Sequence, residues 1–271
     1  MMILFPPAKI NLGLQIHRKR SDGFHEIETC MVPIPFYDIL EVTLSAAFSF
    51  EQTGIKIPGA VGENLCEKAF LLMKSLYPIG NVRIHLRKQI PIGAGLGGGS
   101  SDAAHVLLAL NELFDLKLSP AILREISAEL GSDCPFFISN EIQIGKGRGE
   151  LLTPFTLNLK GIYCVLLNSK IHISTSNVYA GVSPKTPEKS LSDILSLPMK
   201  TWNKYLLNDF EASIFKLYPE INKLKIDLEK YAPFYVSMSG SGSSVFALFA
   251  QKPNLSSDFD RILLKGFVLN N

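Results

Sequence analysis

The sequence predicts a globular protein of mixed strands and helices, with a phosphate-binding loop near its middle. Apolar and polar residues alternate over 8–16, which is typical of a half-buried strand and places Lys9 and Asn11 on one face. Five glycines fall within 93–99, directly before a helical pattern of apolar residues. Glycine allows close backbone approach, and the first turn of a helix offers unpaired N–H groups to an anion. We therefore expect a phosphate loop here rather than a flexible linker.

The other elements of the first half follow in order along the chain. The pattern predicts a strand over 38–44, a helix over 64–76, a strand over 82–86, and helices over 101–114 and 119–130. Ser119 as N-cap, Pro120 at the first helical position and Gly131 just past the end mark the bounds of the last of these helices. Either Ser100 or Ser101 can cap the helix that follows the glycines.

The second half begins near residue 150 and also mixes strands with helices. We expect a strand over 161–167, helices over 203–218 and 221–231, and strands over 234–238 and 244–249. A second glycine-rich segment, 239–243, separates the last two strands and is typical of a tight hairpin turn.

Composition excludes several classes of function. Of the 271 residues, 46% are hydrophobic and 19% charged, so the chain can form a core, and a net charge of +2 does not indicate a nucleic-acid surface. We find no run of 18 apolar residues and no basic leader, and expect neither a membrane span nor secretion. The 4 cysteines are far apart and suggest no zinc site or disulfide framework, so a reducing cytoplasm fits best. We expect small-molecule partners, with no obligate protein partner evident.

The glycine loop fits neither of the common nucleotide-binding motifs. Gly93, Gly95 and Gly98 have the spacing of a dinucleotide fingerprint, but the helix after them leads into a second helix rather than a strand. The Gly-Lys-Ser/Thr ending of a Walker loop is absent. A phosphate loop of another type is therefore indicated.

Three motifs in this order resemble the superfamily of galactokinase, homoserine kinase, mevalonate kinase and phosphomevalonate kinase. They are Pro-Ala-Lys-Ile-Asn-Leu at 7–12, the glycine loop at 91–104 and Ser-Gly-Ser-Gly at 239–242. With Asp-Gly-Phe-His at 22–25, Gly-Ser-Asp-Cys-Pro-Phe at 131–136 and Asn208-Asp209, the chain is most similar to the family that phosphorylates 4-diphosphocytidyl-2-C-methyl-D-erythritol in the non-mevalonate isoprenoid pathway.

The resemblance implies an α+β fold of two domains. The first, 1–152, is expected to bind the nucleotide, and the second, 153–271, the acceptor, with the active site in the cleft between them. The implied cofactors are ATP and Mg²⁺, the divalent ion that usually accompanies a triphosphate.

Phosphoryl transfer to an alcohol needs a cradle for the triphosphate and a carboxylate that accepts the hydroxyl proton. An isolated aspartate in a turn, such as Asp133, is ordinarily a cap residue. The resemblance instead makes Asp133 the base and puts Lys9 beside it, where the lysine favours the ionised carboxylate. Ser100 or Ser101 can reach phosphate or Mg²⁺, and no side chain is assigned as a dedicated metal ligand.

The residues expected to bind the nucleotide are those of the loop and one helix cap. They are Pro91, Ile92, Gly93, Ala94, Gly95, Leu96, Gly97, Gly98, Gly99, Ser100, Ser101 and Asn64. Asn64 matches a position that contacts adenine in the family, and its role as a plain helix N-cap explains it equally well.

The resemblance also implies that two aromatic rings hold a cytosine whose edge is read by a histidine. The substrate-binding residues are expected to be Asn11, Phe24, His25, Thr175, Tyr179, Gly240 and Ser241. Phe24 and Tyr179 stand where tyrosine and phenylalanine are frequent in the family, and Ser176-Asn177 stands where a proline often follows Thr175. Stacking survives these exchanges, whereas the geometry of the loop at Thr175 stays open. Taken singly, the two rings are ordinary core or rim aromatics.

The expected activity is ATP-dependent phosphorylation of the 2-hydroxyl of 4-diphosphocytidyl-2-C-methyl-D-erythritol, giving the 2-phosphate and ADP. One alternative is a kinase of the same superfamily that acts on homoserine, mevalonate or a sugar, none of which needs Phe24, His25 and Tyr179. Another is a non-catalytic nucleotide-binding sensor on the same fold. A sensor has no use for a proton acceptor, so Lys9 and Asp133 argue against it.

Overall fold

The computed structural model describes residues 1–58, 62–173, 181–182, 184–185, 187–259 and 263–270. These residues form two compact units, each built from separate stretches of chain. Unit 1 comprises Met1–Lys9, Phe36–Ile92 and Gly97–Glu141, and unit 2 comprises Ile10–Pro35, Gly93–Leu96 and Ile142–Asn271. The chain therefore passes from one unit to the other and back within the first glycine loop. The domain division expected at residue 152 stays a prediction.

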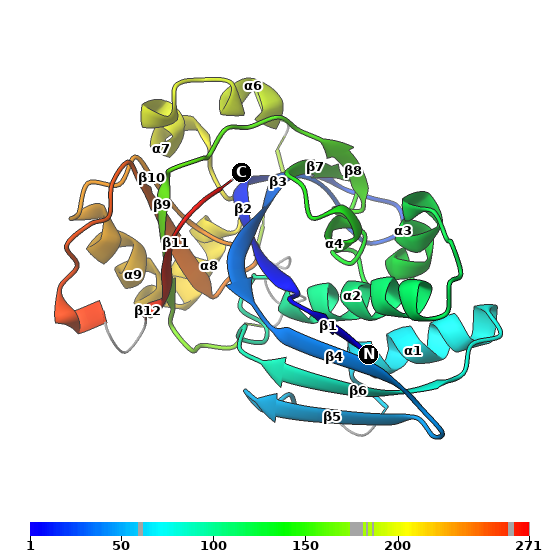
Figure 1. Ribbon diagram of the computed structural model, residues 1–271. Helices are drawn as coiled ribbons and strands as arrows, with labels where there is room; N and C mark the ends of the chain where they lie inside the picture. Colours follow the sequence, from blue (N-terminus) through cyan, green and yellow to red (C-terminus); the bar gives the residue numbers. More distant parts are fainter. Residues whose placement is uncertain (59–61, 174–180, 183, 186, 260–262, 271) are drawn as a thin grey trace. The chain divides into compact units, whose positions relative to one another are not determined.

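Unit 1 contains a four-stranded sheet. Its strands lie in the order β1 (Met2–Leu4), β4 (Ile39–Ser45), β6 (Asn81–Lys88) and β5 (Ser49–Gly54). The pairs β1 with β4 and β4 with β6 are antiparallel, whereas β5 and β6 are parallel and are joined by helix α1 (Leu65–Leu76). Helix α2 (Gly98–Leu113) lies beside α1 along the same face of the sheet (Figure 1). Helices α3 (Pro120–Ala128) and α4 (Phe136–Ser139) complete the unit.

Alternation along β6 explains why the helices cover one face of this sheet. Val82, Ile84 and Leu86 are fully buried, whereas Arg83 and Arg87, on the opposite face of the strand, are exposed. Such a strand needs an apolar cover on one side and water on the other.

Unit 2 contains two four-stranded sheets. One has the order β2 (Pro7–Lys19), β3 (His25–Tyr37), β7 (Gln143–Lys146) and β8 (Leu151–Pro154). The first three residues of β2 and the last two of β3 belong to unit 1. The other has the order β10 (Tyr235–Met238), β11 (Ser244–Phe249), β9 (Tyr163–Asn168) and β12 (Leu263–Val268). Among its described residues, the helices are α6 (Leu191–Leu195), α7 (Trp202–Tyr205), α8 (Glu211–Leu217) and α9 (Pro219–Glu229), with 3₁₀ turns at Met199–Thr201 and Ser257–Phe259.

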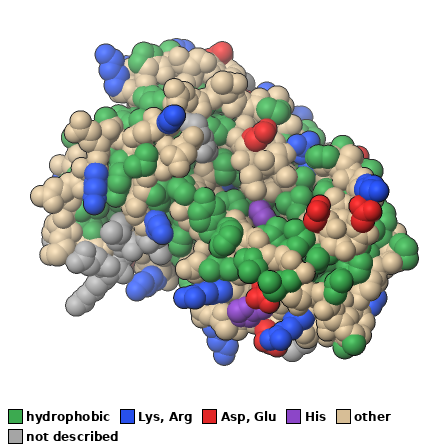
Figure 2. Space-filling view, viewed as in Figure 1, with side chains coloured by type: hydrophobic (Ala, Val, Ile, Leu, Met, Phe, Trp, Pro, Cys, Tyr) green, Lys and Arg blue, Asp and Glu red, His purple; other side chains and the backbone are tan. Residues whose placement is uncertain are grey.

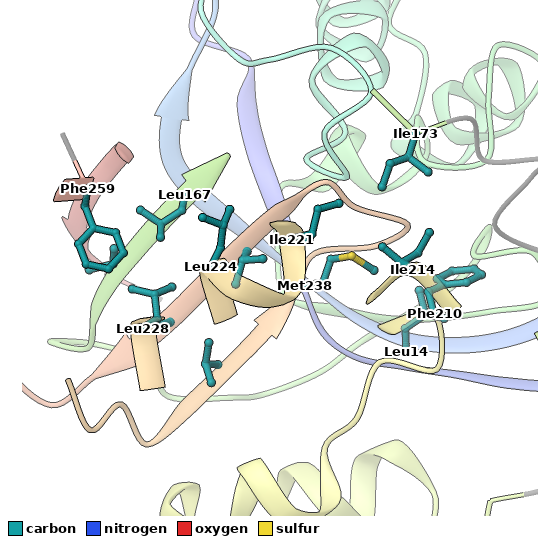
Figure 3. Packing of buried hydrophobic residues seen from close by; sticks show 14 of the residues in the cluster. Leu14, Leu167, Ile173, Phe210, Ile214, Ile221, Leu224, Leu228, Met238 and Phe259 are labelled. Carbon is teal, nitrogen blue, oxygen red and sulfur yellow. The ribbon is translucent and has the colours of Figure 1, made fainter. Parts of the chain in front are cut away.

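The core of unit 2 forms where helices α8 and α9 meet the second sheet. Ile214 and Ile221 from the helices and Met238 and Leu167 from the strands belong to one cluster of buried side chains (Figure 3). Each is 0% exposed, and full burial of an aliphatic side chain of this size contributes roughly 1.5–3 kcal/mol. This packing fixes strands β10 and β11, which the second glycine loop connects.

The strand expected over 8–16 is present, but the prediction that it is only half-buried is wrong. Lys9 and Asn11, the polar residues of that face, are 4% and 3% exposed. Both are buried because partners satisfy them: Lys9 forms an ion pair with Asp133, and Asn11 a hydrogen bond with Thr29.

Two further expectations about helices are corrected by the structure. The helix expected over 203–218 is interrupted at 206–210, because the backbone of Leu14 bonds there to Leu207 O and Asp209 N, each at 2.9 Å. The helix after the glycine loop begins at Gly98 with Gly97 as its N-cap, so neither Ser100 nor Ser101 is the cap. The other expected strands and helices are present with small shifts at their ends.

Candidate active site

The first turn of α2 is suited to an anion. Gly97, its N-cap, has φ 69° and ψ 14°, and no side chain in the described part of the chain caps this helix, whereas Asn64 caps α1 and Ser119 caps α3. Its first amides are therefore left for another acceptor. A Cβ on Gly97 would lie 2.9 Å from the ring of Phe137 and 3.2 Å from Lys9 Cε. Glycine is thus required both for the left-handed backbone and for the space.

Lys9 and Asp133 come together in unit 1. Lys9 Nζ lies 3.4 Å from Asp133 Oδ2, and the two side chains are 5% and 37% exposed. Asp133 sits in the turn between α3 and α4, where Cys134 N donates to Gly131 O at 3.1 Å. The carboxylate is therefore open to a ligand, while the ammonium behind it is held in place on a strand. This is the arrangement that the resemblance implied for a base and its cation.

The two serines of the loop have different surroundings. The Ser100 hydroxyl bonds the thiol of Cys134, whose pKa burial raises to about 12 although this bond acts against the rise. Ser100 thus faces the turn that carries Asp133. The Ser101 hydroxyl is fully buried, and no group in the described part of the chain bonds to it. The described hydrogen bonds of Ser101 involve its main chain. Ser101 N donates to Gly97 O, and Ser101 O accepts from His105 Nδ1.

Asn64 is the N-cap of α1. Its side chain accepts a hydrogen bond from Cys66 N at 2.8 Å, so the capping interpretation is confirmed, and its contact with adenine stays a prediction. A Cβ on Gly99 would lie 3.6 Å from Leu65 Cδ1, so the first turns of α1 and α2 are neighbours. Pro91 and Ile92, before the loop, are half-buried.

In unit 2 the first glycine loop packs directly on the second. Ser239 Oγ donates to Gly95 O at 2.9 Å, and Ser244 N donates to Ala94 O at 3.1 Å. A Cβ on Gly95, where φ is +76°, would lie 1.9 Å from Ser239 O. Ala94 and Leu96 are buried at 3% and 1% exposure. The shape of this part of the loop is therefore set by backbone contact with the distant segment 239–244.

Several residues that shape these loops were not found from the sequence. Asn208 donates to Met238 O and Gly240 O, both at 2.8 Å, and so holds the second loop. Asn208-Asp209 was noted in the sequence as a family motif, but no role was assigned to either residue. The ring of His172 lies against Gly93, where an added Cβ would be 2.6 Å from it, and no local pattern pointed to it.

Three predicted substrate residues have contacts of their own. Asn11 donates to Thr29 Oγ1 at 2.9 Å, and that hydroxyl donates to Gly13 O at 2.7 Å, which ties β2 to β3. Gly240 is buried and Ser241 is half-buried in the second loop. Contact of Asn11, Gly240 and Ser241 with a substrate stays a prediction.

Phe24 and His25 lie at the hairpin between β2 and β3. The ring of Phe24 is 53% exposed, and the Arg148 guanidinium carbon lies over it, 4.8 Å from the centroid. Partial burial, with a smaller effect from Lys19, lowers the pKa of His25 below its ordinary value. Arg148 was missed by sequence reasoning, although the run Gly-Lys-Gly-Arg-Gly signals a turn. Thr175 and Tyr179 lie outside the described residues.

Charges are dispersed on the face drawn in Figure 2, where Lys and Arg side chains lie scattered among apolar and uncharged ones. In the ranges that the structure covers, no three His, Cys, Asp or Glu side chains group as a metal site. Within the same ranges, no helix is both long and apolar enough to cross a membrane.

The fold and the loop define a kinase of the GHMP class. Residues 64–141 match the family described as GHMP kinases N terminal domain, and residues 190–263 match GHMP kinases C terminal. Homoserine kinase from Cytophaga hutchinsonii and mevalonate kinase from Methanococcus jannaschii have the same fold, with a TM-score of 0.68 for each at 17% and 14% identity. The match with homoserine kinase covers 93% of this chain and 85% of that one, and the match with mevalonate kinase covers 96% of this chain and 92% of that one. The expected α+β fold is thereby confirmed.

More similar relatives identify the particular family. The 4-diphosphocytidyl-2-C-methyl-D-erythritol kinases of Cytophaga hutchinsonii and Azobacteroides pseudotrichonymphae are 48% and 50% identical over 253 residues, which is 93% of this chain and 94% of each relative. A crystal structure of 4-(cytidine 5'-diphospho)-2C-methyl-D-erythritol kinase is 35% identical, with a TM-score of 0.78 over 91% of this chain and 90% of that one. The chain belongs to the 4-diphosphocytidyl-2-C-methyl-D-erythritol kinase family.

Proposed function

We propose that this protein transfers the γ-phosphoryl group of ATP to the 2-hydroxyl of 4-diphosphocytidyl-2-C-methyl-D-erythritol, giving the 2-phosphate and ADP for isoprenoid precursor synthesis. The observation that carries the proposal is the ion pair of Lys9 with the exposed carboxylate of Asp133, next to Gly97 of the phosphate loop. Membership of the family agrees with it. We expect the reaction in the cytoplasm, because the four cysteines are free and buried.

Asp133 is assigned as the base. Its carboxylate accepts the proton of the acceptor hydroxyl as the new O–P bond forms. Lys9 places a positive charge beside that carboxylate and restricts its position, since a buried ammonium on a strand has little freedom to move. The main-chain N–H groups at the start of α2 are assigned to the β- and γ-phosphates.

Mg²⁺ is the divalent ion we expect with ATP. Of the two serines, Ser100 is assigned to it or to a phosphate oxygen, because its hydroxyl lies toward the turn of Asp133 and hard cations prefer oxygen ligands. Ser101 is buried and is left out of this assignment. When bound, the ion supplies charge neutralisation for the triphosphate, and most of its other ligands would be phosphate oxygens and water.

Phe24 and His25 are assigned to the cytosine of the acceptor. An exposed ring offers a stacking face, and stacking contributes roughly 1–3 kcal/mol for any base. Discrimination then requires hydrogen bonds to the base edge. Because its pKa is lowered, His25 is neutral at pH 7 and presents one donor and one acceptor nitrogen for that purpose.

The test is ADP release, coupled to an indicator reaction, with ATP, Mg²⁺ and one acceptor at a time. We expect turnover with 4-diphosphocytidyl-2-C-methyl-D-erythritol and at least about 10²-fold lower kcat/KM with mevalonate or homoserine, which lack a base to stack. Equal turnover on mevalonate would contradict the assigned acceptor. ATP binding with no turnover on any acceptor would instead favour a nucleotide sensor.

A further inference from the structure

A cluster of three buried charges lies directly behind the phosphate loop in unit 1. Lys88, the last residue of β6, is 2% exposed, and its Nζ donates to Asp38 Oδ2 and, at 2.7 Å, to Asp102 Oδ2. Asp38 and Asp102 are 0% and 2% exposed. One ammonium therefore serves two carboxylates away from water. None of the three has a part in the chemistry assigned above.

Such a cluster is a weak source of stability. Desolvation of buried ions offsets most of their attraction, and well-packed apolar residues often stabilise a protein as well or better. Burial raises the pKa of the Asp102 carboxyl to about 7, although Lys88 acts against the rise. Burial would lower the pKa of Lys88, but Asp102 and Asp38 together raise it, so the lysine stays charged. What the cluster provides is a defined position for the groups that it joins.

The groups that it joins are the two ends of the phosphate loop. Asp38 Oδ1 accepts from Ile90 N at 2.9 Å and from Gln89 N, which fixes the backbone just before the loop. Asp102 is the fifth residue of α2, directly after the first turn that follows the loop. Through Lys88 the two carboxylates hold both ends in a single network.

Gly98 connects this network to the glycine run. A Cβ on Gly98 would lie 2.8 Å from Lys88 Nζ and 2.8 Å from Ile90 Cγ2. Its backbone is an ordinary helical one, so left-handed geometry is not the reason for glycine here. The absent side chain leaves room for the ammonium group.

We propose that Lys88, Asp38 and Asp102 are positioning residues that hold the first turn of α2 in the conformation that binds the triphosphate. None of them is assigned a contact with ATP. Donors that are already in place spare the nucleotide the free energy of ordering them. The inference rests on the proposed role of this loop in binding ATP.

The test compares Asp102→Ala with Asp102→Asn. Neither variant carries a charge at residue 102, so a difference between them reports position rather than net charge. The asparagine can still accept from Lys88, whereas the alanine leaves Lys88 paired with Asp38 alone. Met73→Ala, a buried change near the end of α1, is the control for loss of stability.

Equilibrium ATP binding without acceptor is the first measurement. We expect Asp102→Ala to bind ATP about tenfold more weakly than Asp102→Asn, as for the loss of one charge-assisted hydrogen bond. The KM for the acceptor should be the same in both variants. Met73→Ala should lower the melting temperature without changing the Kd for ATP. Hydrogen exchange at 97–101 should be faster in Asp102→Ala than in Asp102→Asn, and equal in the two variants over α3.

Equal Kd values for the two Asp102 variants would overturn the positioning role and leave the proposed function intact. So would an ATP affinity in Asp102→Ala that falls only as far as in Met73→Ala. Failure of the wild-type protein to bind ATP is a different result, because it overturns the proposed function and this inference together.

Discussion

The ammonium nitrogen of Lys9 lies 3.4 Å from Oδ2 of Asp133, with the lysine side chain 5% and the aspartate side chain 37% exposed. The cation is thus enclosed while its partner faces outward. A carboxylate held from behind by a buried ammonium is well suited to accept a proton from a ligand in front of it.

Asp133→Asn is expected to lower kcat at least about 10²-fold, because the amide cannot accept the hydroxyl proton. ATP affinity should change little, since Asp133 is not assigned to the phosphates. Steady-state kinetics with direct ATP binding measure both. Asp115→Asn, an exposed aspartate in unit 1, is the matched control. A near-normal kcat in Asp133→Asn would remove Asp133 from the mechanism.

Phe24→Ala is expected to raise the KM for the acceptor by roughly tenfold, because it removes a stacking face of about 1–3 kcal/mol. Phe24→Tyr keeps the ring and should keep the KM. The KM for ATP should be unaffected in both variants. If the KM for ATP rose and that for the acceptor did not, the ring would belong to the nucleotide site instead.

Gly95→Ala is expected to destabilise the protein by at least about 2 kcal/mol. The new Cβ would overlap Ser239 O, and alanine disfavours the positive φ at this position. Gly99→Ala serves as the control for stability, because its Cβ would make an ordinary 3.6 Å contact with Leu65. Urea unfolding of the two variants checks this. Equal stability would show that the two glycine loops are not held together as described.

His105 is expected to make stability depend on pH. Its Nδ1 lies 2.8 Å from Ser101 O and its Nε2 3.3 Å from Asn140 Nδ2, contacts that suit a neutral ring. Burial lowers its pKa, although the Ser101 carbonyl acts against this. The unfolded chain therefore binds more protons below about pH 6.5, and the stability contributed by His105 falls as the pH falls.

The raised pKa of Asp102 gives the opposite slope, because there the folded state binds more protons as the pH falls. The measurement is therefore the difference in unfolding free energy between wild type and His105→Gln. It should shrink between pH 7.5 and pH 5. A difference that stays constant over this range would exclude His105 as the titrating group.

The sequence by itself determined the elements whose signals are local. Asn64 and Ser119 cap their helices as predicted, because a cap side chain bonds to N–H groups two or three residues away. The glycine run and the apolar pattern after it located the loop that leads into α2, and the order of the motifs led to the family. Phe24, His25, Thr175 and Tyr179 were assigned by resemblance, and their contact with the acceptor stays a prediction.

Only the tertiary structure decided matters that depend on residues far apart in the chain. It buried both faces of β2 and broke the helix expected over 203–218. It also turned the Ser100 hydroxyl toward Cys134, in the turn that carries Asp133, and buried the hydroxyl of Ser101. It also brought Asp38 and Lys88 to Asp102. The position of the Lys88 ammonium explains why residue 98 is a glycine, because a Cβ there would lie 2.8 Å from Lys88 Nζ. Periodicity and capping describe one element at a time, whereas a buried charge is tolerated only where a distant partner meets it.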